Sequence, residues 1–134
     1  MAELLPIGVV ESTLTDLEAA PRQGDEGAPD AWLVIDPAVG DALEGVSVGD
    51  EIVVLTWLHQ GNRSVLRTHP RNEVDRPEVG VFATRSPDRP NPIGLHEVTV
   101  LAIDGLRVQV DRMEALDGTP ILDIKPVLSR VEDR

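Results

Sequence analysis

A proline-rich segment with two arginines is the first stretch of this chain whose residue types suggest binding chemistry. Residues 83–95 read ATRSPDRPNPIGL, in a chain with only 12 basic residues. Each proline fixes its own φ angle and donates no backbone hydrogen bond, and the residue before it is held extended. We therefore predict a stiff loop. The guanidinium groups of Arg85 and Arg89 suit a carboxylate or a phosphate, although surface ion pairs with nearby acidic residues are the alternative.

A second stretch, residues 116–124, carries two carboxylates around a glycine. It reads LDGTPILDI, with Asp117 and Asp123 on either side of a turn at Gly118. Two interpretations stay open: a functional pair of acids, or an Asx-type turn followed by an acid on a strand.

Other common catalytic patterns are missing from the sequence. His59, His69 and His96 show no metal-ligand spacing, and the chain has no cysteine, so structural or solvent-exposed roles are favoured over metal binding. Ser86 has no glycine-flanked elbow, which argues against a serine hydrolase. No glycine-rich nucleotide-binding motif follows a strand. The P-x-x-P pattern in SPDRP fits a ligand of proline-recognition modules, but this pattern is common.

The charge is distributed unevenly along the chain. The net charge is −12, and residues 1–62 carry 12 acidic residues against one basic residue. Residues 63–89 carry six arginines against four acids, so the basic residues gather around the proline-rich segment. We expect a local anion site on an otherwise acidic surface.

Length and composition indicate a single globular domain over residues 1–134. Trp32, Trp57 and Phe82 are the only aromatic residues, so the core must be built from Val, Leu, Ile and Ala. The first residues lack the pattern of a secretion signal, and no apolar run is long enough to cross a bilayer, so the cytoplasm is the expected location.

The segments that must position these residues are short and mostly extended. One short helix is expected after residue 36. Asp36 is its candidate N-cap, Pro37 suits its first position, and Gly45 is a stop signal. The sequence Asp104-Gly105 predicts a two-residue hairpin turn. We expect seven or so strands, in an antiparallel barrel or sandwich, from short apolar or alternating runs within residues 6–10, 31–35, 51–59, 64–68, 80–84, 97–111 and 120–128.

Two of these segments resemble a known family. GVFATRSPDRPNPIGL at residues 80–95 and LDGTPILDIKP at residues 116–126 closely resemble the signature segments of the TsaA-like, or TrmO-like, family of tRNA adenosine N6-methyltransferases. PIGVVES near the start and PRQ at residues 21–23 are also similar to the family. The resemblance implies a mainly β fold, a small antiparallel β-barrel with one or two short helices. It also implies binding of S-adenosylmethionine, usually by a homodimer with cofactor sites near the subunit contact.

The resemblance also implies site residues. By matching positions, the cofactor pocket would include Arg85, Ser86, Pro87, Arg89, Asn91, Pro92, Ile93, Gly94, Leu95, Asp117, Gly118, Thr119 and Ile121. Substrate-binding residues would be Arg22, Gln23, Trp57, His59 and Lys125. Candidate proton acceptors are Asp117, Asp123 and His59.

The implied reaction is methyl transfer to N6 of a threonylcarbamoyl-adenosine next to the anticodon of tRNA. Such a displacement depends mostly on holding donor and acceptor in line at close contact. Few aromatic residues and strong negative charge are unusual for an RNA-binding surface. Two alternatives therefore stay open: methylation of a small molecule by the same fold, and a non-catalytic dimeric module that binds a nucleotide-like metabolite or a peptide.

Overall fold

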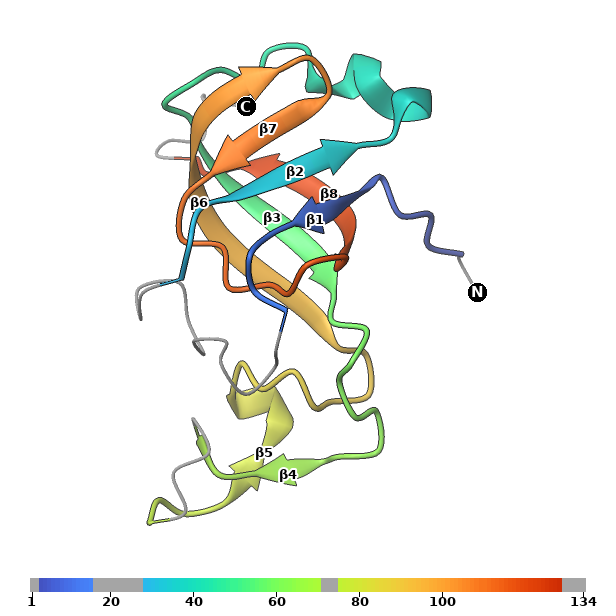
Figure 1. The fold of residues 1–134 in the computed structure, drawn as a ribbon. Coiled ribbons are helices and arrows are strands. Elements are labelled where there is room, and N and C mark those ends of the chain that lie inside the picture. Colours follow the sequence, from blue (N-terminus) through green and yellow to red (C-terminus); the bar gives the residue numbers. More distant parts are fainter. Residues whose placement is uncertain (1–2, 16–27, 71–74, 129–134) are drawn as a thin grey trace.

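The computed structural model of the chain describes residues 3–15, 28–70 and 75–128. Within these residues, six strands pair antiparallel in the order β1-β2-β7-β6-β3-β8 and form a closed barrel (Figure 1). They are β1 (Gly8–Glu11), β2 (Ala31–Ile35), β3 (Glu51–Trp57), β6 (Ile93–Asp104), β7 (Arg107–Val110) and β8 (Pro120–Pro126). The prediction of a mainly antiparallel β fold is confirmed. The described residues contain no helix that is long and apolar enough to cross a membrane.

A separate two-stranded sheet lies beyond one end of the barrel, between β3 and β6 in the chain (Figure 1). It pairs β4 (Arg67–Thr68) with β5 (Val79–Gly80), and a 3-10 helix, η5 (Val81–Ala83), follows directly. We call the described residues from 58 to 92 the arm. The strand expected at residues 80–84 ends at its first residue, because the chain turns into η5 there.

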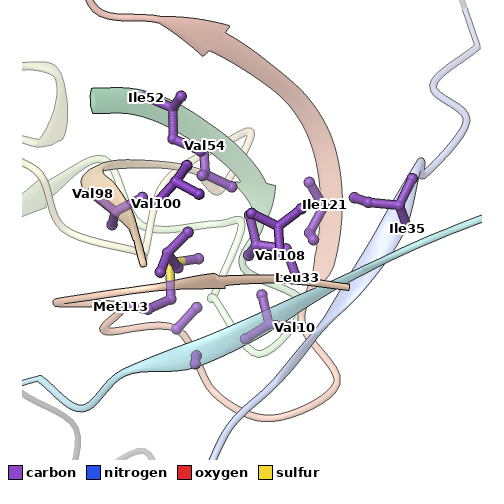
Figure 2. Close-up of a cluster of buried hydrophobic side chains, with 13 residues drawn as sticks. Val10, Leu33, Ile35, Ile52, Val54, Val98, Val100, Val108, Met113 and Ile121 are labelled. Atoms are coloured by element: carbon purple, nitrogen blue, oxygen red, sulfur yellow. The ribbon is translucent and has the colours of Figure 1, made fainter. Parts of the chain in front are cut away.

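The barrel interior is filled by aliphatic side chains that alternate along the strands. On β3, and on β6 as far as Val100, every second residue is buried, as the period of a strand requires. Figure 2 shows the buried side chains converging from several strands. The cluster consists of Val10, Ala31, Leu33, Ile35, Ile52, Val54, Val98, Val100, Val108, Val110, Met113, Ala115 and Ile121. The expected aliphatic core is therefore confirmed for the described residues.

The predicted helix start and hairpin are both present, with small differences. Asp36 caps a helix by accepting a hydrogen bond from the Ala38 amide at 2.9 Å, but the helix, η3 (Pro37–Leu43), is of the 3-10 type. Asp104 pairs with Arg107, so the two loop residues of the hairpin are Gly105 and Leu106. Gly105 has a φ of 60°, which suits the first central position of a hairpin turn.

Candidate functional site

The proline-rich segment is folded around the side chain of Arg89. Its Nη1 donates to the carbonyl oxygens of Thr84 and Ser86 at 3.1 and 3.2 Å, and its Nη2 donates to the Val81 carbonyl oxygen at 2.6 Å. Prolines cannot supply backbone donors, so the guanidinium replaces the amide ladder that this segment lacks. Arg89 therefore organises the loop from within, instead of presenting a free guanidinium to a ligand.

The chain after β3 supports the same loop from the other side. Arg63 Nε donates to the Pro90 carbonyl oxygen at 2.7 Å, and Arg63 Nη2 donates to Asn91 Oδ1 at 3.0 Å. The same guanidinium lies over the Trp57 ring, 5.2 Å from its centre. Gly61 allows this close packing, because a Cβ atom at that position would lie 2.4 Å from the Pro87 carbonyl oxygen.

Arg85 differs from both of these arginines. Its side chain is exposed, and it makes no hydrogen bond or ion pair with any other residue that the structure describes. Phe82, three residues earlier, is 84% exposed. Within the described part of the loop, Arg85 is thus the guanidinium whose donors are available to a bound anion.

The second signature segment is a tight turn attached to β1. The Gly118 amide donates to the Val10 carbonyl oxygen at 2.7 Å, and Gly118 has a φ of +83°, which favours glycine. Asp117 Oδ1 accepts a hydrogen bond from the Ser12 amide at 3.0 Å, while Thr119 Oγ1 donates to the Leu116 carbonyl oxygen at 2.7 Å. Asp117 therefore lies in a turn, but it does not form the expected Asx-type turn, because its carboxylate bonds to Ser12 and the Thr119 amide donates to the Leu116 carbonyl oxygen. The residue is exposed.

The two signature segments meet at one end of the barrel. Thr56, near the end of β3, pairs with Gly94 on β6 and with Ile121 on β8. Neighbouring strands lie about 4.8 Å apart, so Gly94 and Ile121 are separated by about 10 Å, one strand between them. This end of the barrel also faces the arm (Figure 1).

The outer surface of the barrel at this end carries apolar side chains with charges beside them. Leu55 on β3 lies between Leu95 on β6 and Asp123 on β8, and Trp57 pairs with Ile93 one step further along β3. Ile93 and Leu95 are 44% and 39% exposed. This patch and the adjacent proline-rich loop form an open surface that is apolar in part and charged at its edges.

The structure divides the predicted site residues by position. Ser86, Pro87, Arg89 and Asn91 lie in the proline-rich loop with Arg85, and their polar contacts are mostly internal to the arm. Four other predicted site residues, Pro92, Gly94, Thr119 and Ile121, are buried. Lys125 and Asp123 are exposed neighbours on β8, with 3.9 Å between Nζ and Oδ2. Arg22 and Gln23 lie outside the described residues.

The three candidate proton acceptors do not form one cluster. Asp117 belongs to the turn beside β1, Asp123 projects from β8, and His59 is exposed just after β3. No contact joins these side chains to one another in the described part of the chain. Nor do the described residues contain a group of three or more His, Asp or Glu side chains placed to hold a metal ion.

Three polar residues that matter to this geometry were absent from the predicted set. They are Arg63, whose contacts are given above, and the hydrogen-bonded pair His96 and Glu114, of which His96 is buried in the barrel and Glu114 is partly buried. His96 occupies an inward position of β6, in phase with Val98 and Val100. Strand alternation in the sequence carried that signal, whereas no sequence pattern indicates that Glu114 is its partner.

Comparisons with known proteins agree with the geometry. Residues 9–133 match the model of the tRNA-methyltransferase O N-terminal domain. A probable S-adenosyl-L-methionine-binding protein of Methanothermobacter thermautotrophicus is 41% identical over 127 residues, which are 95% of this chain and 90% of the relative. An S-adenosyl-L-methionine-binding protein of Archaeoglobus fulgidus is 42% identical over 122 residues, 91% of this chain and 86% of the relative.

Some similar proteins are longer than this chain. A probable S-adenosyl-L-methionine-binding protein of Archaeoglobus fulgidus is 39% identical over 132 residues, but this chain spans only 36% of its length. The crystal structure of TrmO from Pseudomonas aeruginosa matches the whole chain with a TM-score of 0.76 and 30% identity, and 61% of that protein is covered. The family resemblance of the two signature segments is confirmed. The fold of the chain, its two signature segments and these relatives show that the chain belongs to the family of the tRNA-methyltransferase O N-terminal domain.

Proposed function

We propose that this chain is an S-adenosylmethionine-dependent methyltransferase that methylates N6 of threonylcarbamoyl-adenosine next to the anticodon of tRNA. The observation that carries the proposal is that the two signature segments meet at one end of the barrel, one strand apart. Family membership and the S-adenosylmethionine-binding relatives support the choice of cofactor.

The side chains available at this end of the barrel fit the cofactor by chemical type. The free guanidinium of Arg85 suits a carboxylate, and the exposed carboxylates of Asp117 and Asp123 suit an ammonium or ribose hydroxyl groups. Ile93 and Leu95 offer an apolar surface for an adenine face. S-adenosylmethionine, when bound, supplies an electrophilic methyl group on a sulfonium centre.

We propose that the chain accelerates transfer mainly by orientation. The loop held by Arg89 and Arg63 is already rigid, so little conformational entropy is lost when donor and acceptor are brought into line. The exocyclic amine loses a proton during the reaction. Asp117, Asp123 or His59, which are all exposed, would accept it.

The proposed RNA contact is the arm. It carries the described arginines of the basic segment, whereas the barrel strands and the N-terminal part of the chain are rich in acids. Arg85 would bind phosphate if it does not hold the cofactor. The other substrate contacts would come from Trp57, His59 and Lys125, and from Arg22 and Gln23 in the segment before β2. Phosphate contacts of this kind make affinity strongly salt-dependent.

We further propose a homodimeric, cytoplasmic protein whose 134 residues form one domain. Leu66 and Phe82 lie where β4 and η5 adjoin, and they are 65% and 84% exposed. Large exposed apolar side chains in one place commonly mark an interaction surface. A second subunit seated there would also cover the open surface beside the proline-rich loop.

A methyl-transfer assay tests the proposal and separates it from a second candidate. The purified chain is incubated with methyl-labelled S-adenosylmethionine and tRNA that contains, or lacks, threonylcarbamoyl-adenosine, and the digested nucleosides are identified by mass spectrometry. Label at N6 of the modified adenosine alone is the expected result. The net charge of −12 favours a small-molecule acceptor as the second candidate, and label confined to an added metabolite extract would support it. Cofactor binding with no transfer to either would indicate a non-catalytic module.

A further inference from the structure

A chain of three polar side chains crosses the barrel interior at the end that faces the arm. His96 Nε2 lies 2.7 Å from Thr56 Oγ1, and His96 Nδ1 lies 2.6 Å from Glu114 Oε1. Thr56 and His96 are 0% and 3% exposed, and the Glu114 side chain is 18% exposed. A buried imidazole is costly unless both of its nitrogens have partners, and here both do.

These three residues connect the two signature segments. His96 directly follows Leu95, the last residue of the proline-rich signature, and Glu114 precedes Leu116, the start of the second signature, by two residues. Thr56 lies on the strand between them and pairs with Gly94 on one side and Ile121 on the other. The contact from His96 to Glu114 therefore spans the interior beneath the site and joins the ends of both segments.

The hydrogen-bond directions are restricted by the carboxylate. An ionised Glu114 only accepts, so Nδ1 of His96 carries a hydrogen that it donates to Oε1. The opposite nitrogen then shares one hydrogen bond with the hydroxyl group of Thr56. Hydrogen bonds at both ring nitrogens therefore fix the orientation of the His96 imidazole.

The network also explains a glycine in the first signature. A Cβ atom at Gly94 would lie 2.5 Å from Thr56 Oγ1 and 2.7 Å from His96 Nε2. The hydroxyl and the imidazole thus occupy the space of a side chain at this position. As a result, the backbone at Gly94 lies directly against β3, and this sets where the proline-rich loop leaves the barrel.

We propose that His96 and Glu114 are positioning residues for the S-adenosylmethionine site, because they hold the two signature segments at a fixed separation and register. This inference rests on the proposed function. Their role in the proposal is to position the segments, not to contact the cofactor. An apolar pair of similar volume would fill the same space with equal or greater stability, because replacing both partners of a buried hydrogen bond by apolar groups costs little folding free energy. The polar pair supplies orientation that an apolar pair lacks.

Paired measurements on one set of variants test this role. For each variant, the urea midpoint of unfolding is measured by tryptophan fluorescence, and Kd for S-adenosylmethionine is measured by calorimetry. The key variant is the double substitution His96→Met with Glu114→Met, which removes both polar groups. Glu114→Gln is the conservative variant, since its amide oxygen still accepts from Nδ1. Val100→Ala, on the same strand and in the same core, is the control for a simple loss of packing.

We expect the double variant to unfold at or above the wild-type urea concentration and to bind S-adenosylmethionine at least about tenfold more weakly, which corresponds to about 1.4 kcal/mol. Glu114→Gln should retain Kd within about threefold of wild type, a change below 1 kcal/mol. Val100→Ala should unfold at lower urea with an unchanged Kd. Thr56→Val, which removes only the hydroxyl, provides a second comparison if the double variant does not fold, and it should also weaken Kd.

The possible failures are distinct. Wild-type affinity in both the double variant and Thr56→Val would overturn the positioning role and leave the proposed function intact. An equal loss of affinity in Val100→Ala would also overturn it, because any damage to the core would then suffice. No binding of S-adenosylmethionine by the wild-type chain would refute the proposed cofactor, and this inference with it.

Discussion

Two arginines of the same loop have different environments. Arg89 gives its hydrogen bonds to three backbone carbonyl oxygens of the loop and η5, while Arg85 is exposed and without a partner among the described residues. The sequence alone does not distinguish them, since both lie in one short proline-rich segment. Their contacts assign the first to loop structure and leave the second for a ligand.

This difference predicts separate effects of Arg89→Ala and Arg85→Ala. Loss of the Arg89 hydrogen bonds should disorder the loop and weaken S-adenosylmethionine binding by about tenfold or more, because each bond to a charged donor contributes about 1.5–3 kcal/mol before solvent screening. Arg85→Ala should leave the unfolding midpoint unchanged and lower the affinity for one anion. Calorimetry with the cofactor and tRNA-binding titrations identify that anion. Normal cofactor binding by Arg89→Ala would contradict the structural role.

The proton acceptor is a second prediction about single residues. Asp117→Asn, Asp123→Asn and His59→Ala each remove one candidate base while leaving the barrel core untouched. General-base contributions are typically about 100-fold or more, so one of the three should lower the single-turnover rate of methylation by that amount. Equal rates in all three variants would exclude a protein base from this reaction.

The first and last segments of the arm, which adjoin β3 and β6, are joined by close backbone packing rather than by a sheet. Gly61 and the segment that follows it rest against the proline-rich loop, and Asn62 donates its amide hydrogen to Asp88 Oδ1 at 2.8 Å. The amide of Leu58 also donates to the Pro92 carbonyl oxygen at 2.7 Å. Correct geometry of the loop therefore depends on a neighbouring turn that contains no signature residue.

Gly61→Ala tests this dependence. A methyl group there would lie 2.4 Å from a backbone oxygen, so the loop must move, at a cost of roughly 1–3 kcal/mol. We expect weaker cofactor binding in calorimetry. Gly40→Ala is the matched control, because its added carbon meets only the movable end of the Leu106 side chain, at 2.7 Å. Equal affinities in the two variants would show that the packing at Gly61 is not needed.

At the level of the whole molecule, the net charge of −12 is distributed unevenly: the barrel is acidic and the arm is basic. Two of the most exposed large apolar side chains, Leu66 and Phe82, lie on the arm where β4 and η5 adjoin. Such exposure is unfavourable for an isolated chain in water. A partner that covers these side chains would remove the cost and complete the open site.

The proposed dimer predicts a change of mass on substitution of this surface. Leu66→Ser with Phe82→Ser should convert the protein from dimer to monomer in light scattering, with little change in strand content by circular dichroism. Leu101→Ser, on the outer face of β6 away from the arm, is the control and should remain dimeric. A wild-type chain that is monomeric at all concentrations would disprove the dimer.

Local patterns in the sequence determined much of this protein. Alternation and turn residues predicted the β class, the cap at Asp36 and the hairpin near Gly105, because these depend on neighbours along the chain. Prolines predicted that residues 83–95 form neither helix nor strand. This is correct from Thr84 to Pro92 but wrong at the ends, because Ala83 closes η5 and β6 begins at Ile93, directly after the last proline. The two signatures also identified the family from residue types alone.

Tertiary structure decided how those segments are used. Three features depend on residues far apart in the sequence. They are the free guanidinium of Arg85, the need for glycine at positions 61 and 94, and the pairing of His96 with Glu114. Such contacts arise only when the barrel closes and brings β3, β6 and β8 side by side. Residue type fixes which hydrogen bonds a side chain is able to make, but the packing of distant strands determines which of them it makes.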